Sequence, residues 1–216
     1  REIADRHNLV ILEDSADTLA ATINGQSTGA FSDISITSFY GSHVINGAGN
    51  GGMLCMNDDA QFTHARLLRS WGRSSSVFGV DESESIENRF NVAVDDIPYD
   101  AKFVFEEIGY QLEPSEISAA FARVQFGKLE RNIALRENHF EQQYAFFEKY
   151  GELFELPRQL PGSRTGWLAF PVRVRQRAPF KRRELQVFLE QRNIQTRVVF
   201  TGNILRQPGF ASIDCK

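Results

Sequence analysis

Three short apolar runs near the start of the chain constrain its fold most strongly. They are LVILED (9–14), ISITSF (34–39) and GMLCM (52–56), and glycine-rich loops separate them. Runs of this length bounded by turn residues are typical of strands. The first suits a buried parallel strand, which requires helices on both faces of its sheet. The chain is therefore expected to contain an α/β domain.

Helical periodicity marks two later segments. Residues 60–71 form one candidate helix, and from Pro114 onward apolar residues recur at helical spacing over about 35 residues, or about 50 Å of helix. Ser115 is the expected N-cap and Gly151 the expected stop. This segment is predicted to be one helix, or two in line, connecting two domains.

The last part of the chain has a β-α-β order. WLAFPVRV (167–174) and TRVVF (196–200) are predicted strands on either side of a helix at 181–192. This order is typical of a small second domain. Before the long helix, residues 74–107 are polar and rich in serine and acids, and are expected to form an excursion loop with a hairpin.

The resulting division has three parts. We expect part of a large cofactor-binding α/β domain at 1–113, a connecting helix at 114–150, and a partial small α+β domain at 151–216. Because the chain opens inside a helix without methionine and ends without a closing helix, the sequence suggests a fragment of a longer enzyme.

Composition excludes several classes of protein. The 24 Lys and Arg against 28 Asp and Glu give a net charge of −4, which offers no support for nucleic-acid or anionic-membrane binding. No apolar run reaches the ~18 residues of a membrane span, and no signal peptide is expected. Cys55 and Cys215 provide neither a disulfide framework nor a zinc site. A cytoplasmic location without a bound metal is expected.

Polar motifs follow the predicted strands. GAGNGG (47–52) fits G-x-G-x-x-G formally, but a strand rather than a helix follows it, so it is interpreted as a glycine turn. Glu13-Asp14 ends the first strand, at the edge of an α/β sheet where ligands bind. SFYGSH (38–43) ends the second. Taken singly, these motifs are better explained by caps, loop salt bridges or a loop histidine.

Together the motifs resemble one family. The order EDSAD, SFYGSH, GNGG, RSWGR (69–73) and IGYQLEPSEISAAF (108–121) is similar to the DegT/DnrJ/EryC1/StrS sugar aminotransferases. The resemblance covers essentially the whole chain. It implies fold-type I, the aspartate-aminotransferase-like fold of enzymes that use pyridoxal phosphate (PLP).

His43 is the position that departs from most of the family. The usual pattern S-F-x-x-x-K supplies a lysine that forms a Schiff base with PLP, and an imidazole cannot form one. It can move protons near neutral pH. Histidine in this position is similar to the 3-dehydrases of CDP-4-keto-6-deoxyglucose and GDP-4-keto-6-deoxymannose, which use pyridoxamine phosphate (PMP). Asp17 and Tyr40 also match these dehydrases.

The resemblance assigns roles to the remaining residues. It implies Asp14 at the pyridine nitrogen, Ala16 against the ring, Asp17 near the ring oxygen or substrate, and Ser38 at the cofactor phosphate. His43 is the implied base, with Tyr40 orienting it or the sugar. Arg197 and Asn203 are candidate substrate contacts. For Arg197, a surface salt bridge is an equally good explanation.

One cofactor of the cytidine-type dehydrase is not expected. Its iron–sulfur cluster needs four cysteines, whereas this chain has Ala16, Ser75 and Val77 in or near the corresponding positions.

The implied function is a PMP-dependent 3-dehydratase of a nucleotide-linked 4-keto-6-deoxyhexose in deoxysugar or lipopolysaccharide O-antigen biosynthesis. Glutamate is the implied amino donor and a homodimer the implied assembly. The alternatives are a PLP-dependent sugar aminotransferase and a non-catalytic, cofactor-binding regulatory relative.

Overall fold

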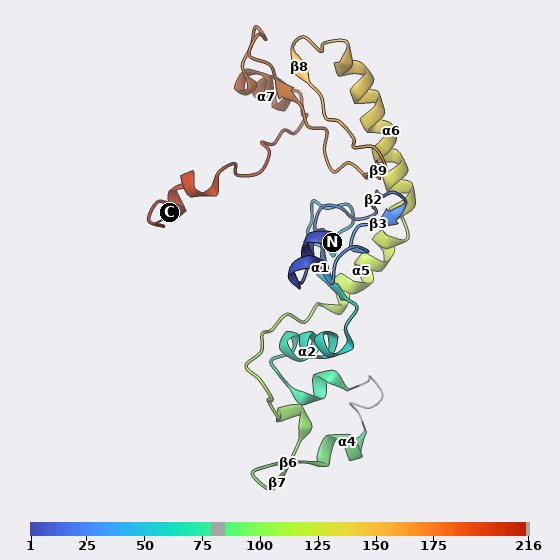
Figure 1. Ribbon diagram of the computed structural model, residues 1–216, viewed down its shortest axis with the longest axis vertical. Helices are drawn as coiled ribbons and strands as arrows, with labels where there is room; N and C mark the ends of the chain where they lie inside the picture. Colours follow the sequence, from blue (N-terminus) through green and yellow to red (C-terminus); the bar gives the residue numbers. More distant parts are fainter. Residues whose placement is uncertain (79–84, 215–216) are drawn as a thin grey trace. The chain divides into compact units, whose positions relative to one another are not determined.

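The computed structural model describes residues 1–78 and 85–214 (Figure 1). Residues 79–84 of the predicted excursion, and Cys215, lie outside the described residues. The chain divides into two compact units. The first comprises Arg1–Leu135 and Pro161–Leu168, and the second comprises Arg136–Leu160 and Ala169–Lys216.

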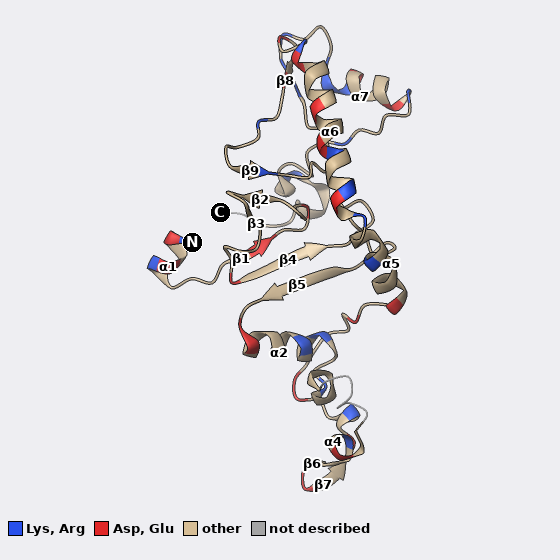
Figure 2. Cartoon of the chain, turned by 90° about the vertical axis from the view of Figure 1, so that its right-hand side faces the viewer, with Lys and Arg blue, Asp and Glu red and all other residues tan. Residues whose placement is uncertain are grey.

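The central sheet of the first unit contains the three strands predicted from the apolar runs. β1 (Leu12–Asp14), β4 (Ile34–Ser38) and β5 (Gly52–Met56) lie side by side in that order (Figure 2). β1 and β4 are parallel, with Asp14 opposite Ile36, and β4 and β5 are antiparallel. The mixed sheet agrees with the α/β class.

The expected burial of the first strand is wrong in this structure. The ladder begins only at Leu12, and the side chains of Leu9, Val10 and Leu12 are 55%, 64% and 62% exposed. β1 is an edge strand, so its apolar side chains lack the cover that a central parallel strand receives.

A second small sheet was not predicted. β2 (Thr22–Ile23) and β3 (Gln26–Ser27) form a hairpin, and β9 (Ser163–Arg164) pairs with β2. Asn24 and Gly25 at the hairpin turn both have positive φ, 50° and 78°. Asn-Gly is a strong signal for this turn, so the sequence held evidence for the hairpin. The pairing with β9 joins distant segments and has no local signal.

Three helices of the first unit lie where helices were expected from the sequence. α1 spans Glu2–His7, and α2 spans Asp59–Arg69, with Asp58 accepting a 2.7 Å hydrogen bond from the Gln61 amide. α5 (Glu116–Phe126) is capped by Ser115, as predicted.

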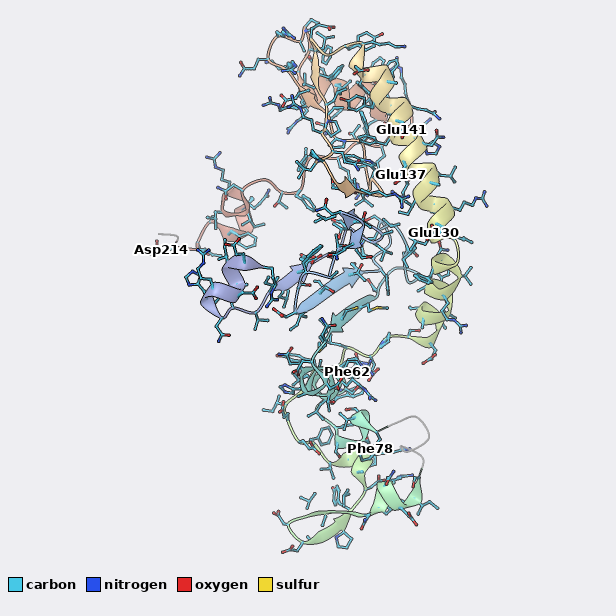
Figure 3. All side chains as sticks on the ribbon, turned by 45° about the vertical axis from the view of Figure 1, so that its right-hand side comes forward. Phe62, Phe78, Glu130, Glu137, Glu141 and Asp214 are labelled. Carbon is cyan, nitrogen blue, oxygen red and sulfur yellow. The ribbon has the colours of Figure 1, made fainter. Side chains whose placement is uncertain are left out.

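The long helical segment is two helices. α6 (Leu129–Glu148) follows α5 after a break at residues 127–128 and ends before Gly151. Its acidic residues include Glu130, Glu137 and Glu141, which lie along the helix (Figure 3).

The excursion after α2 contains short elements, including the expected hairpin. They are η1 (Ser74–Val77), α4 (Ile86–Phe90), β6 (Val92–Val94), β7 (Ile97–Tyr99) and η2 (Ala101–Phe103). β6 and β7 are antiparallel.

The second unit is built on an aromatic cluster. Phe147 lies 5.0 Å from Phe154 and 5.5 Å from Phe170 between ring centroids, and Phe140 lies 5.1 Å from Phe170. The unit's regular elements are β8 (Phe154–Glu155), β10 (Arg173–Val174), α7 (Arg182–Glu190), η3 (Ile204–Arg206) and η4 (Pro208–Phe210).

Two strand predictions in this unit are wrong in extent or type. Of the strand expected at 167–174, only Arg173–Val174 pairs, with β8. Residues 196–200 form no strand, and Val199 and Phe200 are 80% and 77% exposed. A run rich in β-branched residues becomes a strand only where another strand completes its ladder, and no described strand pairs with this run.

Candidate active site

Two loops leave the same edge of the parallel pair β1–β4 and bring Asp17 and His43 together. Asp17 follows β1 and His43 follows β4. The His43 Nε2 atom lies 2.9 Å from Asp17 Oδ1, and the two side chains are 16% and 34% exposed. The carboxyl edge of parallel strands is the usual ligand-binding edge of α/β sheets.

The loop that carries His43 is held by its own backbone and by the glycine turn. The His43 amide donates to Tyr40 O at 3.0 Å. Phe39 is bonded on both sides, its amide to Gly51 O and its carbonyl to the Gly47 amide, each at 2.8 Å. The residues directly after His43, Val44 and Ile45, are buried at 8% and 2% exposure. The glycine turn therefore fixes the histidine loop and forms no nucleotide fingerprint.

The two ring nitrogens of His43 have different surroundings. Nδ1 lies 3.3 Å from Ser38 O, and because a carbonyl only accepts, Nδ1 carries the proton in this contact. Nε2 is left facing Asp17. Oδ1 of Asp17 is buried and receives no hydrogen bond from the described residues, and its 2.9 Å contact with Nε2 is an ion pair only while the ring is protonated.

Tyr40 lies beside His43 on the solvent-exposed side of this pair. Its ring is 57% exposed and meets the His43 ring edge-on, with centroids 5.8 Å apart. Its amide donates to Ser38 Oγ at 3.2 Å. The phenol is thus beside the imidazole and open to a ligand.

The residues expected to hold the cofactor surround the same edge. Asp14 ends β1 with an exposed side chain, and its Oδ1 accepts a 3.1 Å hydrogen bond from the Ala16 amide (Figure 2 shows the acidic end of β1 in red). Ser38 is the last residue of β4. Asp14, Ala16, Asp17 and Ser38 thus lie at the ends of two neighbouring strands.

Arg197 and Asn203 lie in the second unit, apart in the chain from these residues. Asn203 caps η3, accepting a 3.0 Å hydrogen bond from the Leu205 amide. Its side chain therefore has a structural partner already.

Three further residues have structural or chemical interest, and two of them, Thr37 and Arg73, were not singled out from the sequence. Glu13 joins β1 to the loop before β4 by accepting from the Gly29 amide at 2.9 Å and from Ser15 Oγ. Thr37 Oγ1 and Arg73 Nε are buried without a hydrogen-bond partner in residues 1–78 and 85–214. The RSWGR motif contains Arg73, but the motif alone gave it no role.

The described residues contain no group of three or more His, Cys, Asp or Glu side chains placed to hold a metal ion. Nor do residues 1–78 and 85–214 include a helix long and apolar enough to cross a membrane.

Comparison with known proteins identifies the family. The profile of the DegT/DnrJ/EryC1/StrS aminotransferase family matches residues 1–214. The chain belongs to this family. The resemblance inferred from the motifs is thereby confirmed, and with it the fold class.

Individual relatives and solved structures agree with this family assignment. The lipopolysaccharide biosynthesis protein RfbH of Salmonella typhimurium is 32% identical over 99% of the chain and 49% of its own length. The dTDP-4-dehydro-2,6-dideoxy-D-glucose 3-dehydratase of Saccharopolyspora spinosa is 34% identical over 98% and 46%. The structure of E. coli GDP-4-keto-6-deoxy-D-mannose-3-dehydratase with bound hydrated PLP superposes with a TM-score of 0.77, at 24% identity, over 95% of the chain and 50% of its own. The chain spans about half the length of the curated relatives it matches.

Proposed function

We propose that this protein is a PMP-dependent 3-dehydratase of a nucleotide-linked 4-keto-6-deoxyhexose. The observation that carries the proposal is His43, with Nε2 directed at Asp17, in the position where the family pattern has lysine. The relatives include a 3-dehydratase that is 34% identical over nearly the whole chain. Deoxysugar biosynthesis, and lipopolysaccharide O-antigen synthesis in particular, is the proposed pathway.

The residues at the β1–β4 edge fit PMP or PLP. Asp14 presents an exposed carboxylate, which suits a protonated pyridine nitrogen, and Asp17 has a buried oxygen that lacks a donor. An amine or hydroxyl of the cofactor would satisfy that oxygen, which otherwise pays for its desolvation. Ala16 would lie against the ring and Ser38 at the phosphate. When bound, the cofactor supplies an amine for the keto sugar and a ring that accepts electrons.

His43 is the proposed base and acid. Nδ1–H on Ser38 O holds the ring orientation, so Nε2 accepts and returns the proton. The Asp17 carboxylate lies against the same nitrogen, and Tyr40 orients His43 or the sugar at the open side.

Further parts of the proposal concern the substrate and the assembly. Arg197 and Asn203 are proposed substrate contacts, and glutamate is the proposed amino donor that restores the cofactor. A homodimer is proposed because α5 contains no buried residue and exposes Ile117, Phe121, Val124 and Phe126. The division at residues 113 and 150 into large domain, connector and small domain stays a proposal. We propose no iron–sulfur cluster from this region, since Ala16, Ser75 and Val77 offer no thiolate.

The test is product analysis with PMP and nucleotide-linked 4-keto-6-deoxyhexoses. The proposal predicts a product lacking one oxygen atom of the substrate, and ammonia released in equal amount. A product that carries nitrogen in place of the keto oxygen would instead identify an aminotransferase. Cofactor binding with every sugar left unchanged would favour the regulatory relative.

A further inference from the structure

The excursion after α2 closes on itself at a neck formed by residues 70–74 and 104–112. The Trp71 amide donates to Tyr110 O, and the Glu106 amide donates to Gly72 O, both at 2.8 Å. Gly72 and Gly109 allow this approach, since a Cβ on Gly72 would overlap Glu107 O and one on Gly109 would overlap the Gly72 amide nitrogen. The neck therefore has a fixed backbone.

The neck places a guanidinium between two aromatic rings. The Arg73 Cζ atom lies 4.4 Å from the centroid of Trp71 and 5.5 Å from that of Phe105. Both rings remain partly exposed, at 37% and 54%. Trp71 has a φ of 62°, a left-handed conformation that a bulky side chain rarely adopts. Strain of this kind persists only where the surroundings impose it, and it is concentrated at functional sites.

Arg73 differs from its neighbours in lacking a polar partner. Its Nε is buried without a hydrogen bond, and no ion pair joins it to another described residue. In contrast, Arg66 donates to Ser76 O at 2.8 Å and Phe78 O at 3.0 Å, and Arg69 lies 3.3 Å from Glu113. Ring faces stabilise a cation but do not satisfy its N–H groups. Arg73 is thus held in place with its buried Nε–H unpaired.

We propose that Arg73 binds a phosphate group, and that in the proposed reaction this is a phosphate of the nucleotide sugar. The planar guanidinium matches two phosphate oxygens at once, and the two rings fix its plane in advance. This assignment of the ligand rests on the proposed function, which requires a diphosphate-linked substrate. A glutamate carboxylate is the other anion that a guanidinium would accept, and the experiment separates the two.

The experiment measures ligand binding without any reaction. Trp167→Phe leaves Trp71 as the single tryptophan reporter, and the protein is titrated with pyrophosphate, inorganic phosphate, glutamate and chloride at constant ionic strength. We expect a saturable change in Trp71 fluorescence with pyrophosphate. Arg73→Gln should weaken that binding roughly ten- to hundredfold, the usual loss for a charge-assisted contact. Arg66→Gln is the matched control and should leave the affinity unchanged.

A readout on the native residue protects the test against misfolded variants. The ¹⁵N-labelled Arg73 Nε–H resonance should shift on saturation with pyrophosphate. Unchanged affinity in Arg73→Gln, a static Arg73 resonance, or saturation by glutamate but not pyrophosphate would overturn the proposal. Because no sugar is present, pyrophosphate binding can succeed even if the proposed dehydratase activity fails.

Discussion

Asp17 Oδ1 and His43 Nε2 are 2.9 Å apart although they belong to loops after different strands. The parallel pairing of β1 with β4 is the cause, because Asp14 lies opposite Ile36 and both chains then leave the sheet at the same edge. An imidazole and a carboxylate separated in sequence are thus brought into contact by the pairing of the two strands.

The first prediction concerns Asp17. Asp17→Asn keeps the size of the side chain but removes its charge, so we expect kcat to fall roughly tenfold or more, a part of the ~10²–10⁴ supplied by a positioned acid–base group. The ¹⁵N resonances of the His43 ring should change in the same variant. Asp95→Asn, in the exposed β6–β7 turn, is the control and should leave kcat and the His43 resonances unchanged. Wild-type kcat in Asp17→Asn would remove Asp17 from the proposed mechanism.

Replacement of His43 tests the lysine position. Borohydride reduction followed by peptide mapping should find no cofactor attached to any lysine of the wild-type protein. His43→Lys should give a covalently attached cofactor on the peptide containing residue 43, and activity should move toward amino transfer. His43→Asn supplies the control, since it can neither attach the cofactor nor move a proton. A reduced cofactor on a wild-type lysine would contradict the assignment.

The neck of the excursion predicts a sensitive glycine. Gly109→Ala places a methyl group against the Gly72 amide nitrogen and Trp71 carbonyl carbon, so we expect the free energy of unfolding to fall by about 1–3 kcal/mol. Gly41→Ala has open space around its Cβ and an ordinary φ, and should change it little. Urea unfolding measures both. Equal free energies of unfolding for the two variants would show that the neck backbone accommodates the added methyl group without cost.

A pH effect is expected at the base of the β6–β7 hairpin. Arg89 donates three hydrogen bonds of 2.6–3.0 Å to Asp100, which lower the pKa of that carboxyl below its usual range. Since the folded pKa is depressed, the pair stabilises the segment above the unfolded pKa of about 4 and is lost as pH falls further. The protection factors of the Phe103 and Val104 amides, which correct for the intrinsic slowing of exchange at low pH, should decrease there, and Asp100→Asn should abolish that dependence.

The exposed face of α5 predicts the assembly. Ile117, Phe121 and Val124 share one side of the helix and are 78%, 42% and 59% exposed. If a second copy covers them, Ile117→Glu should shift the protein to a monomer in light scattering at micromolar concentration. Arg123→Glu adds a carboxylate on another side of α5 and serves as the control. A wild-type monomer with full activity would refute the homodimer.

Local signals predicted the local elements well. The Ser115 cap and the apolar runs of β4 and β5 are read within a few residues of sequence, and the structure has these elements in those places. The strand predicted at 196–200 is absent because local signals were not enough. Its residues have a strong preference for strands, but a strand forms only when a distant partner strand pairs with it.

The candidate site could be predicted only in part. The resemblance carried by the motif order assigned Asp17 and His43 to one site. The number of residues between them does not reveal the β1–β4 register that brings them into contact. Nor does the sequence distinguish Arg73 from Arg66, because the difference lies in which carbonyls each guanidinium reaches.

The pairing of β9 with β2 has a consequence for dissecting the gene. Residues 161–168 belong to the first unit although the second unit begins at residue 136, so neither unit is one continuous stretch of chain. A gene fragment ending at residue 135 would encode β2 with an open edge, which invites pairing between molecules. Recombination or truncation that keeps each unit whole must therefore carry residues 161–168 with the first unit.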